Sequence, residues 1–247
     1  MKWLQFGVAT LLLGVLSIVP AAATFDSDPP KDAEFTYARI RFHMTSDAVF
    51  EMRRELPWHH DYPYGDEGFA TFVKEVTRIH TASNAYQIVD IDSPDLFKYP
   101  FAYLCEPGYL ELSEKDTNNL REYFERGGFM LIDDFRGARH LNNLIYQMKK
   151  VFPNRNITPL TLSHSIFNSF YKIESLDMQP PYGYEPVQFL GMTDDRGDLM
   201  MVINYNNDLG EVWQWLDEGT LSLQDAAQSR YLNYALSVIT SRALPDV

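Results

Sequence analysis

Two short, uniformly apolar runs with a helical segment between them constrain the fold of this chain most strongly. The runs are FAYLC at 101–105 and FMLI at 129–132, and neither shows the alternation of a half-exposed strand. Such runs are typical of parallel strands that are buried on both faces. Between them, Ser113 and Asp116 have the spacing of a helix capping box, and Gly127 follows the helical segment as a stop signal. This strand–helix–strand unit predicts a parallel sheet covered by helices.

The rest of the chain extends the same pattern. Further strands are predicted at 35–44, 86–89, 187–192 and 199–204, and further helices at 67–81, 141–151 and 230–243. Asp66 is the expected N-cap of the helix at 67–81. The last two strands flank TDDRGD, which predicts a hairpin. We therefore expect an α/β fold, a three-layer sandwich with a mainly parallel sheet and a C-terminal β-hairpin.

The N-terminus has the features of a secretory signal peptide. Lys2 is followed by an apolar run from Leu4 to Val19, and Ala21 and Ala23 form a small-residue cleavage site. The alternative is a membrane anchor, because the run is close to the length that spans a bilayer. We expect a signal peptide at 1–23, a linker at 24–34 and a single domain at 35–247. The protein is then exported, to the periplasm or outside the cell, with no stable membrane span after cleavage.

Charge and cysteine content exclude several functions. The formal net charge is −13, and removal of Lys2 makes it −14 (−13 − 1). Such an acidic chain repels phosphate backbones, so nucleic acid is not an expected partner. Cys105 is the only cysteine, which excludes an internal disulfide. The adjacent Glu106 disfavours a thiolate, so we expect Cys105 to be a buried apolar residue rather than a nucleophile. No cofactor is predicted.

Several segments resemble a bacterial family known as domain of unknown function 4159. They are FTYARIRF, DYPYGDEGFATFVKEVTRIHT, PFAYLCEPGYLELSEKDTNNLREYFERGGFMLIDDF, HSIFNSFYKI and LNYAL, in this order along the chain. The family is similar to class I glutamine amidotransferases, which have a flavodoxin-like α/β fold. The resemblance therefore implies a fold and no particular reaction.

The stretch GGFMLIDDFRG at 127–137 resembles the strand–turn–helix that carries the nucleophilic cysteine of those amidotransferases. Asp133 and Asp134 stand at the turn instead, so we do not expect amide transfer. We expect Asp133 to face a cleft and Asp134 to accept bonds from the backbone amides at the start of the next helix. Arg136, Arg139 or a metal ion would balance their charge. In the alternative interpretation, both acids only satisfy backbone donors of the turn.

Two other segments carry candidate site residues. In WHHDYPYGD at 58–66, His59, His60 and Asp61 are candidate metal ligands, although their spacing matches no standard motif. The alternative is a loop held by its aromatic residues. His164 is a candidate base, by its resemblance to the amidotransferase histidine, but Ile166 stands where the partner acid is expected. The alternative for His164 is a structural role. The polar run at 204–208 is assigned to turns without chemistry.

We therefore expect an exported, non-catalytic binding or scaffolding domain in the bacterial envelope. Its partner would be an unknown envelope protein or a small ligand. The expected ligand-binding residues are Asp61, Tyr62, Glu106, Asp133 and Arg136. The rival is a hydrolase, with or without a metal, whose candidate catalytic residues are Asp133, Asp134 and His164.

Export gives a first testable prediction. Cleavage after Ala23 places Thr24 at the N-terminus of the mature protein. N-terminal sequencing of the protein isolated from the cell envelope should therefore begin at Thr24. A protein that still begins at Met1 would instead be an anchored one.

Overall fold

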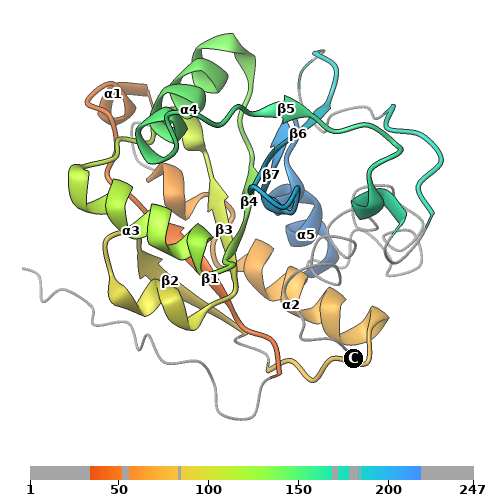
Figure 1. The fold of residues 1–247 in the computed structure, drawn as a ribbon. Helices are drawn as coiled ribbons and strands as arrows, with labels where there is room; N and C mark the ends of the chain where they lie inside the picture. Colours follow the sequence, from red (N-terminus) through yellow and green to blue (C-terminus); the bar gives the residue numbers. More distant parts are fainter. Residues whose placement is uncertain are drawn as a thin grey trace, which may run out of the picture.

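The computed structural model describes residues 34–51, 56–82, 85–168, 172–177, 183 and 185–217 (Figure 1). The strands are β1 (Tyr37–Arg41), β2 (Tyr86–Asp90), β3 (Phe101–Cys105), β4 (Phe129–Asp133), β5 (Thr158–Pro159), β6 (Gln188–Thr193) and β7 (Leu199–Tyr205). The helices are α1 (Ala48–Glu51), α2 (Tyr64–Val76), α3 (Glu114–Glu125), α4 (Gly137–Val151) and α5 (Leu209–Asp217). Short 3-10 turns are η1 (Pro57–His59), η2 (Pro94–Lys98), η3 (Pro107–Tyr109) and η4 (Ser165–Asn168).

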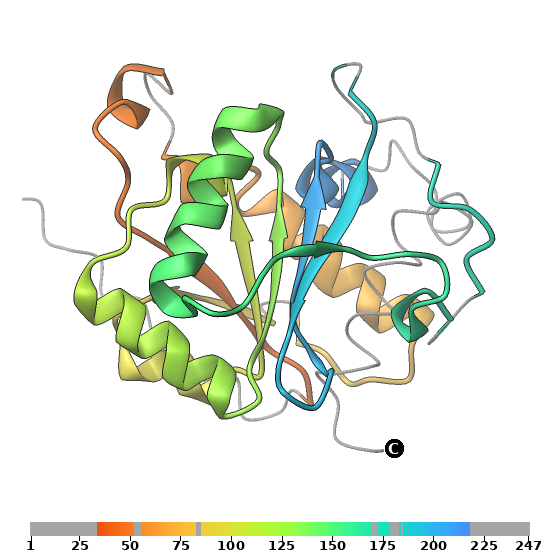
Figure 2. The ribbon, with the colours of Figure 1, turned by 45° about the horizontal axis from the view of Figure 1, so that its top comes forward.

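Within the described residues, seven strands form one mixed sheet in the order β2-β1-β3-β4-β7-β6-β5. The first five of these are parallel to one another, and β6 and β5 extend the sheet in antiparallel pairing. The predicted α/β class, the mainly parallel sheet and the hairpin of β6 and β7 are confirmed. The arrowheads of β3, β4 and β7 point in the same direction, so the carboxyl ends of these strands lie at the same end of the sheet (Figure 2).

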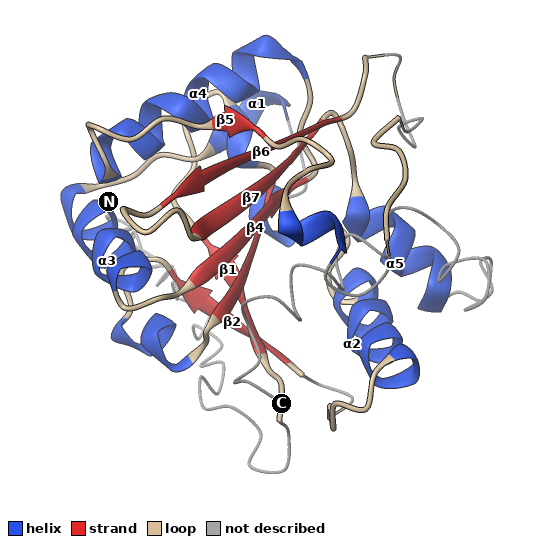
Figure 3. Cartoon of the chain, turned by 45° about the vertical axis from the view of Figure 1, so that its right-hand side comes forward, coloured by secondary structure: helices blue, strands red, loops and turns tan. Residues whose placement is uncertain are grey.

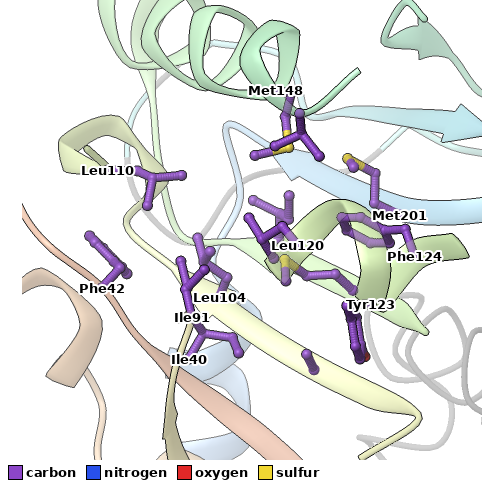
Figure 4. Packing of buried hydrophobic residues seen from close by; sticks show 14 of the residues in the cluster. Ile40, Phe42, Ile91, Leu104, Leu110, Leu120, Tyr123, Phe124, Met148 and Met201 are labelled. Atoms are coloured by element: carbon purple, nitrogen blue, oxygen red, sulfur yellow. The ribbon is translucent and has the colours of Figure 1, made fainter. Parts of the chain in front are cut away.

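Helices cover both faces of the sheet, as Figure 3 shows. On one face, Leu120 of α3 and Met148 of α4 pack on strand residues such as Leu104 and Met201 (Figure 4). On the other face, α2 and α5 pack on the aromatic side chains of β1, β3 and β4. Gly68 allows the close contact between α2 and α5, because a Cβ atom there would collide with the carbonyl group of Trp213. The strands are apolar throughout because both faces are buried.

Local signals predicted α3 correctly. The Ser113 hydroxyl accepts a bond from the Asp116 amide at 3.1 Å, and the Asp116 carboxylate accepts one from the Ser113 amide at 2.9 Å. The capping box is therefore present. The helix ends before Gly127, which has a φ of 93° that a side chain would disfavour.

The start of α2 differs from the prediction. The helix begins at Tyr64, so Asp66 lies inside its first turn and is not the N-cap. The Asp66 carboxylate is fully buried and bonds instead to the guanidinium of Arg39 at 2.7 Å and to the Tyr37 hydroxyl at 2.6 Å. Both partners lie on β1. The helix also ends at Val76, earlier than predicted.

Helix α4 begins four residues before the predicted start at 141. Its first residue, Gly137, has no capping side chain in the preceding sequence. Its amide donates to the Asn206 side chain at 3.2 Å, across 69 residues of sequence. A cap supplied from so far along the chain leaves no local sequence signal.

The predicted signal peptide at 1–23 and the closing helix at 230–243 lie outside the described residues, as does most of the linker at 24–34. Among the described helices, none combines the length and the apolar character that crossing a bilayer requires.

A buried ion pair connects the sheet to α2 and to the loop after β1. Besides the bond to Asp66, the Arg39 guanidinium donates to the Trp58 carbonyl at 3.1 Å, to the His60 carbonyl and to the Cys105 sulfur at 3.3 Å. The Cys105 thiol donates to the Pro57 carbonyl at 3.2 Å, so the expectation of a buried cysteine is confirmed. The Arg39 guanidinium thereby connects β1 to α2, to the loop after β1 and to the end of β3.

Removing the charge of Asp66 should therefore be costly. Asp66→Asn leaves the Arg39 guanidinium buried without a counter-ion, and we expect the free energy of unfolding to fall by about 3–5 kcal/mol. Urea denaturation followed by circular dichroism measures this loss.

The matched control is Asp90→Asn. Asp90 pairs with Arg41, two residues further along β1, but both side chains of this pair are more than one-third exposed. Its loss should be less than about 1 kcal/mol. Equal losses for the two variants would contradict a stabilising role specific to the buried pair.

Candidate functional site

Three neighbouring parallel strands end in polar residues with an unusual backbone. Glu106 follows β3, Asp134 follows β4 and Asn206 follows β7, with φ values of 48°, 54° and 59°. Asp61, in the loop after β1, has a φ of 60°. Left-handed backbone at a non-glycine residue costs free energy, and such residues concentrate at functional sites. We call this end of the sheet, at the carboxyl ends of the strands, the rim. It comprises Asp61, Glu106, Asp134 and Asp208 with their neighbours His60 and Arg136.

Asp133 is fully buried and is held by four hydrogen bonds. Its carboxylate accepts from the Tyr103 hydroxyl at 3.0 Å and from the Asn204 side chain at 2.6 Å. It also accepts from the amides of Leu209 at 2.7 Å and Gly210 at 3.2 Å. The last two are the first amides of α5, whose positive dipole end favours a negative charge. Burial raises the pKa of Asp133 to about 6, which leaves it ionised at neutral pH.

Asp134 is equally buried but has a different environment. One oxygen, Oδ2, lies 2.6 Å from His60 Nδ1. The hydrogen bond with Asp134 raises the pKa of His60 to about 10, so the two form an ion pair. The other oxygen, Oδ1, accepts no hydrogen bond from any described residue, and the Arg136 guanidinium is 3.8 Å from it.

Three more acids crowd the rim. Burial raises the pKa of Asp61 to about 7, and the pKa values of Glu106 and Asp208 to about 8 each. Repulsion by Asp134 adds to the shifts of Glu106 and Asp208. Arg136 donates to Asp208 at 3.3 Å. Four acids therefore lie close to few cationic side chains, with His60 beside Asp61 and Asp134 and Arg136 beside Asp134 and Asp208, which favours a bound proton or cation.

A pocket of about 610 Å³ opens beside the rim, within the range of small-molecule sites. Its wall consists of Leu56, His59, His60, Asp61, Tyr62, Tyr64, Glu211 and Gln214. It lies between the loop after β1 and the start of α5. Gly210 makes room for the Asp61 carboxylate, because a Cβ atom there would collide with it.

The family model for Domain of unknown function (DUF4159) matches residues 48–238, more than three-quarters of the chain. The chain belongs to this family. No curated protein matches it. All the rim residues lie inside the matched range, whereas β1, with Arg39, lies before it.

This DUF4159 domain brings together most of the residues selected from the sequence. Asp61 and Tyr62 line the pocket, and Glu106 and Arg136 lie at the rim beside Asp134. His164 is not among them in any described contact. Its amide donates to the Thr161 carbonyl and its ring accepts from the Ile166 amide, so it organises its own turn before η4.

The expected division between the two elbow acids is reversed. Asp133 was expected in the cleft, but it is the acid that binds backbone amides, and those amides belong to α5 rather than to α4. Asp134 was expected to be structural, but it carries the oxygen without a hydrogen bond beside His60. Arg139 does not balance either acid, because its guanidinium binds Asp47 and Glu51 near α1.

The candidate metal ligands are also regrouped. His60, Asp61 and Asp134 each offer a ligand atom, and these atoms lie within 4.8 Å of one another. His59 is not in this group: its ring packs edge-on against Trp58 and lies 4.9 Å from the ring of Tyr62. The sequence placed two of the three residues but could not show that a strand end 74 residues away completes the group.

The run at 204–208 has a larger role than turn formation. Asn204, Asn206, Asn207 and Asp208 are all buried, and Asp208 caps α5 by accepting from the Glu211 amide at 2.9 Å. A signal for α5 was present in the sequence. Asp208 and Glu211 have capping-box spacing, and Leu209, Val212 and Trp213 follow with the spacing of a helix face.

The contrast between the adjacent acids can be tested by stability. Asp133→Asn replaces one acceptor oxygen by an NH₂ donor, so either the α5 amides or the Asn204 side chain loses its acceptor. We expect the free energy of unfolding to fall by about 2–3 kcal/mol. Asp134→Asn is the matched comparison. It breaks the ion pair with His60, but the His60 side chain is 32% exposed and can release its proton, and repulsion among the rim acids is relieved, so its loss should stay below about 1 kcal/mol. Thermal unfolding of the two variants at neutral pH measures the difference, and the opposite order would contradict this assignment.

Proposed function

We propose that this domain is an exported, non-catalytic binding module whose rim pocket takes a small ligand with a cationic group. One observation carries the proposal. The pocket joins acidic side chains to aromatic ones, with Asp61 and Glu211 beside Tyr62 and Tyr64. Carboxylates attract a cation directly, and aromatic faces attract it through their quadrupole.

The burial of Asp133 and Cys105, the two residues considered as nucleophiles, supports binding rather than covalent catalysis. Asp133, at the expected elbow, is engaged by four donors. Cys105 is buried, and burial holds the pKa of its thiol well above the ordinary value. A nucleophile needs an ionised or base-activated group that the substrate can reach. Neither residue meets this requirement.

The kinship with glutamine amidotransferases and the flavodoxin-like assignment are part of this proposal. The parallel strands run in the order β2-β1-β3-β4-β7, which is the order 2-1-3-4-5 of a doubly wound sheet. Ligands of such sheets bind at the carboxyl ends of the strands, where the rim lies. Export is supported by the features of residues 1–23. A partner protein in the envelope would use the same module as a scaffold.

A metal-dependent hydrolase remains the second candidate, because His60, Asp61 and Asp134 gather beside one pocket. Three protein ligands with an open position are typical of catalytic zinc sites. Binding is preferred because His164, the proposed base of the hydrolase, makes its described contacts elsewhere.

The proposal is tested with pairs of ligands that differ in charge. Glucosamine against N-acetylglucosamine, and spermidine against a neutral polyol, are titrated by isothermal calorimetry into the purified protein. We expect the cationic member of at least one pair to bind at least tenfold more tightly than its neutral counterpart, and to lose affinity as salt rises.

Tyr64→Ala should weaken that binding about tenfold, because the tyrosine contributes a face to the pocket. Tyr146→Ala is the matched control. Both side chains are exposed, 53% and 62% respectively, but Tyr146 lies on α4, in the other helical layer. No preference for cationic members would contradict the proposal. Turnover of a nitrophenyl ester, phosphate or glycoside that Asp134→Asn abolishes would favour the hydrolase.

A further inference from the structure

We infer that the rim holds a divalent transition-metal ion, bound by His60, Asp61 and Asp134 at the base of the pocket. The inference deepens the proposed function, since it rests on the same rim being the binding site, and it names a metal ion as a ligand. The three residues come from two segments: the loop before α2 and the end of β4.

The decisive observation is a pair of buried carboxylate oxygens that lack hydrogen bonds. The side chain of Asp134 is 1% exposed, and its Oδ1 has no hydrogen-bond donor among the described residues. The Asp61 Oδ2 is also buried without a hydrogen-bond donor among the described residues. A buried carboxylate oxygen without a donor carries a large desolvation cost. A metal ion bound by both carboxylates would reduce this cost if Asp134 turned Oδ1 toward it or bound it through both oxygens.

The ligand atoms lie within 4.8 Å of one another, so side-chain movements of about 1–1.5 Å would bring them to the separations of a metal centre. Ligands at 2.0–2.2 Å from a tetrahedral ion lie about 3.4 Å apart. His60 Nδ1 lies 3.7 Å from Asp61 Oδ2 and 2.6 Å from Asp134 Oδ2. The separation from Asp61 is slightly longer than the spacing of two metal ligands, and the separation from Asp134 is the length of a hydrogen bond. Binding requires His60 to give up its proton and to move from Asp134 by less than about 1 Å.

The ligand set selects the kind of ion. One imidazole and two carboxylates suit zinc or manganese, whereas calcium and magnesium prefer oxygen ligands alone. His60 and Asp61 also line the pocket, so an ion between them would keep a coordination position open toward it.

A shared proton is the competing explanation. Asp208 and Asp134 are within hydrogen-bonding reach of each other, and a proton on Asp208 could satisfy Asp134. Arg136 faces both acids, at 3.3 Å from Asp208 and 3.8 Å from Asp134. A proton leaves Asp61 Oδ2 unsatisfied, however, whereas a metal ion would engage both Asp61 and Asp134. The experiment must therefore separate metal binding from protonation.

The protein is treated with chelator, dialysed and titrated by calorimetry at fixed pH with Zn²⁺, Mn²⁺, Ca²⁺ and Mg²⁺ as separate chloride salts. We expect one Zn²⁺ or Mn²⁺ ion per chain, bound at least tenfold more tightly than Ca²⁺ or Mg²⁺. The melting temperature should rise with the bound ion, because the ion binds only the folded state.

Variants then locate the ion. Asp134→Asn and Asp61→Asn should each weaken its affinity by at least about 10–100-fold. His60→Gln should do the same, whereas His43→Gln, which changes an imidazole that is 76% exposed and outside this pocket, should leave the affinity within about twofold. Circular dichroism of the metal-free variants verifies their fold. Two carboxylate variants are used so that a failure of one to fold leaves the other to decide.

The inference is overturned if none of the four ions binds or raises the melting temperature, which would assign the rim to a shared proton. It is also overturned if Ca²⁺ binds more tightly than Zn²⁺ and Mn²⁺, or if His43→Gln weakens binding as much as His60→Gln. Metal binding without binding of any organic cation would support the metal centre and contradict the proposed organic ligand. The reverse result would contradict only the metal centre.

Discussion

The buried ion pair between Arg39 and Asp66 is the interaction on which the position of the rim depends. A charge placed in the interior is tolerated only when it is paired and its donors are used. Arg39 meets this condition through the Asp66 carboxylate, two loop carbonyls and the Cys105 sulfur. One of those carbonyls belongs to His60. The position of the His60 side chain at the rim therefore follows from a charge pair within the layer between the sheet and α2.

The carboxylates at the rim and directly beneath it are stabilised by two kinds of partner. The carboxylates of Asp133 and Asp208 accept from amides at the start of α5, which supply partial positive charge without a cationic side chain. Asp134 and Asp61 depend on His60 instead. A helix terminus can satisfy only the acids that reach its first turn. The acids beyond its reach are the ones that a ligand or ion can compete for.

Elements set by neighbours in sequence could be predicted, and elements set by distant contacts could not. The capping box of α3 and the apolar runs of β3 and β4 are local, and the structure has them where the sequence indicated. Asp66 has the sequence position of an N-cap, but its partner, Arg39, lies 27 residues earlier on another element, so no local pattern indicates the pairing. The candidate ligand group requires Asp134 to meet His60 across 74 residues. Polar residues are satisfied by geometry that a linear pattern does not contain.

The opposite roles of Asp133 and Asp134 nevertheless follow from a rule that the sequence does contain. Side chains alternate between the two faces of a strand, so Asp133 shares the face of Phe129 and Leu131. Those two side chains belong to the core beneath α2 and α5, whereas Met130 and Ile132 belong to the core beneath α3 and α4. Asp133 must then lie under α5 and meet its first amides. Asp134 comes after the last strand residue, where a left-handed turn ends the alternation and directs the chain along the rim. The alternation of side chains along β4 therefore places Asp133 in the core beneath α5, whereas Asp134 lies at the rim.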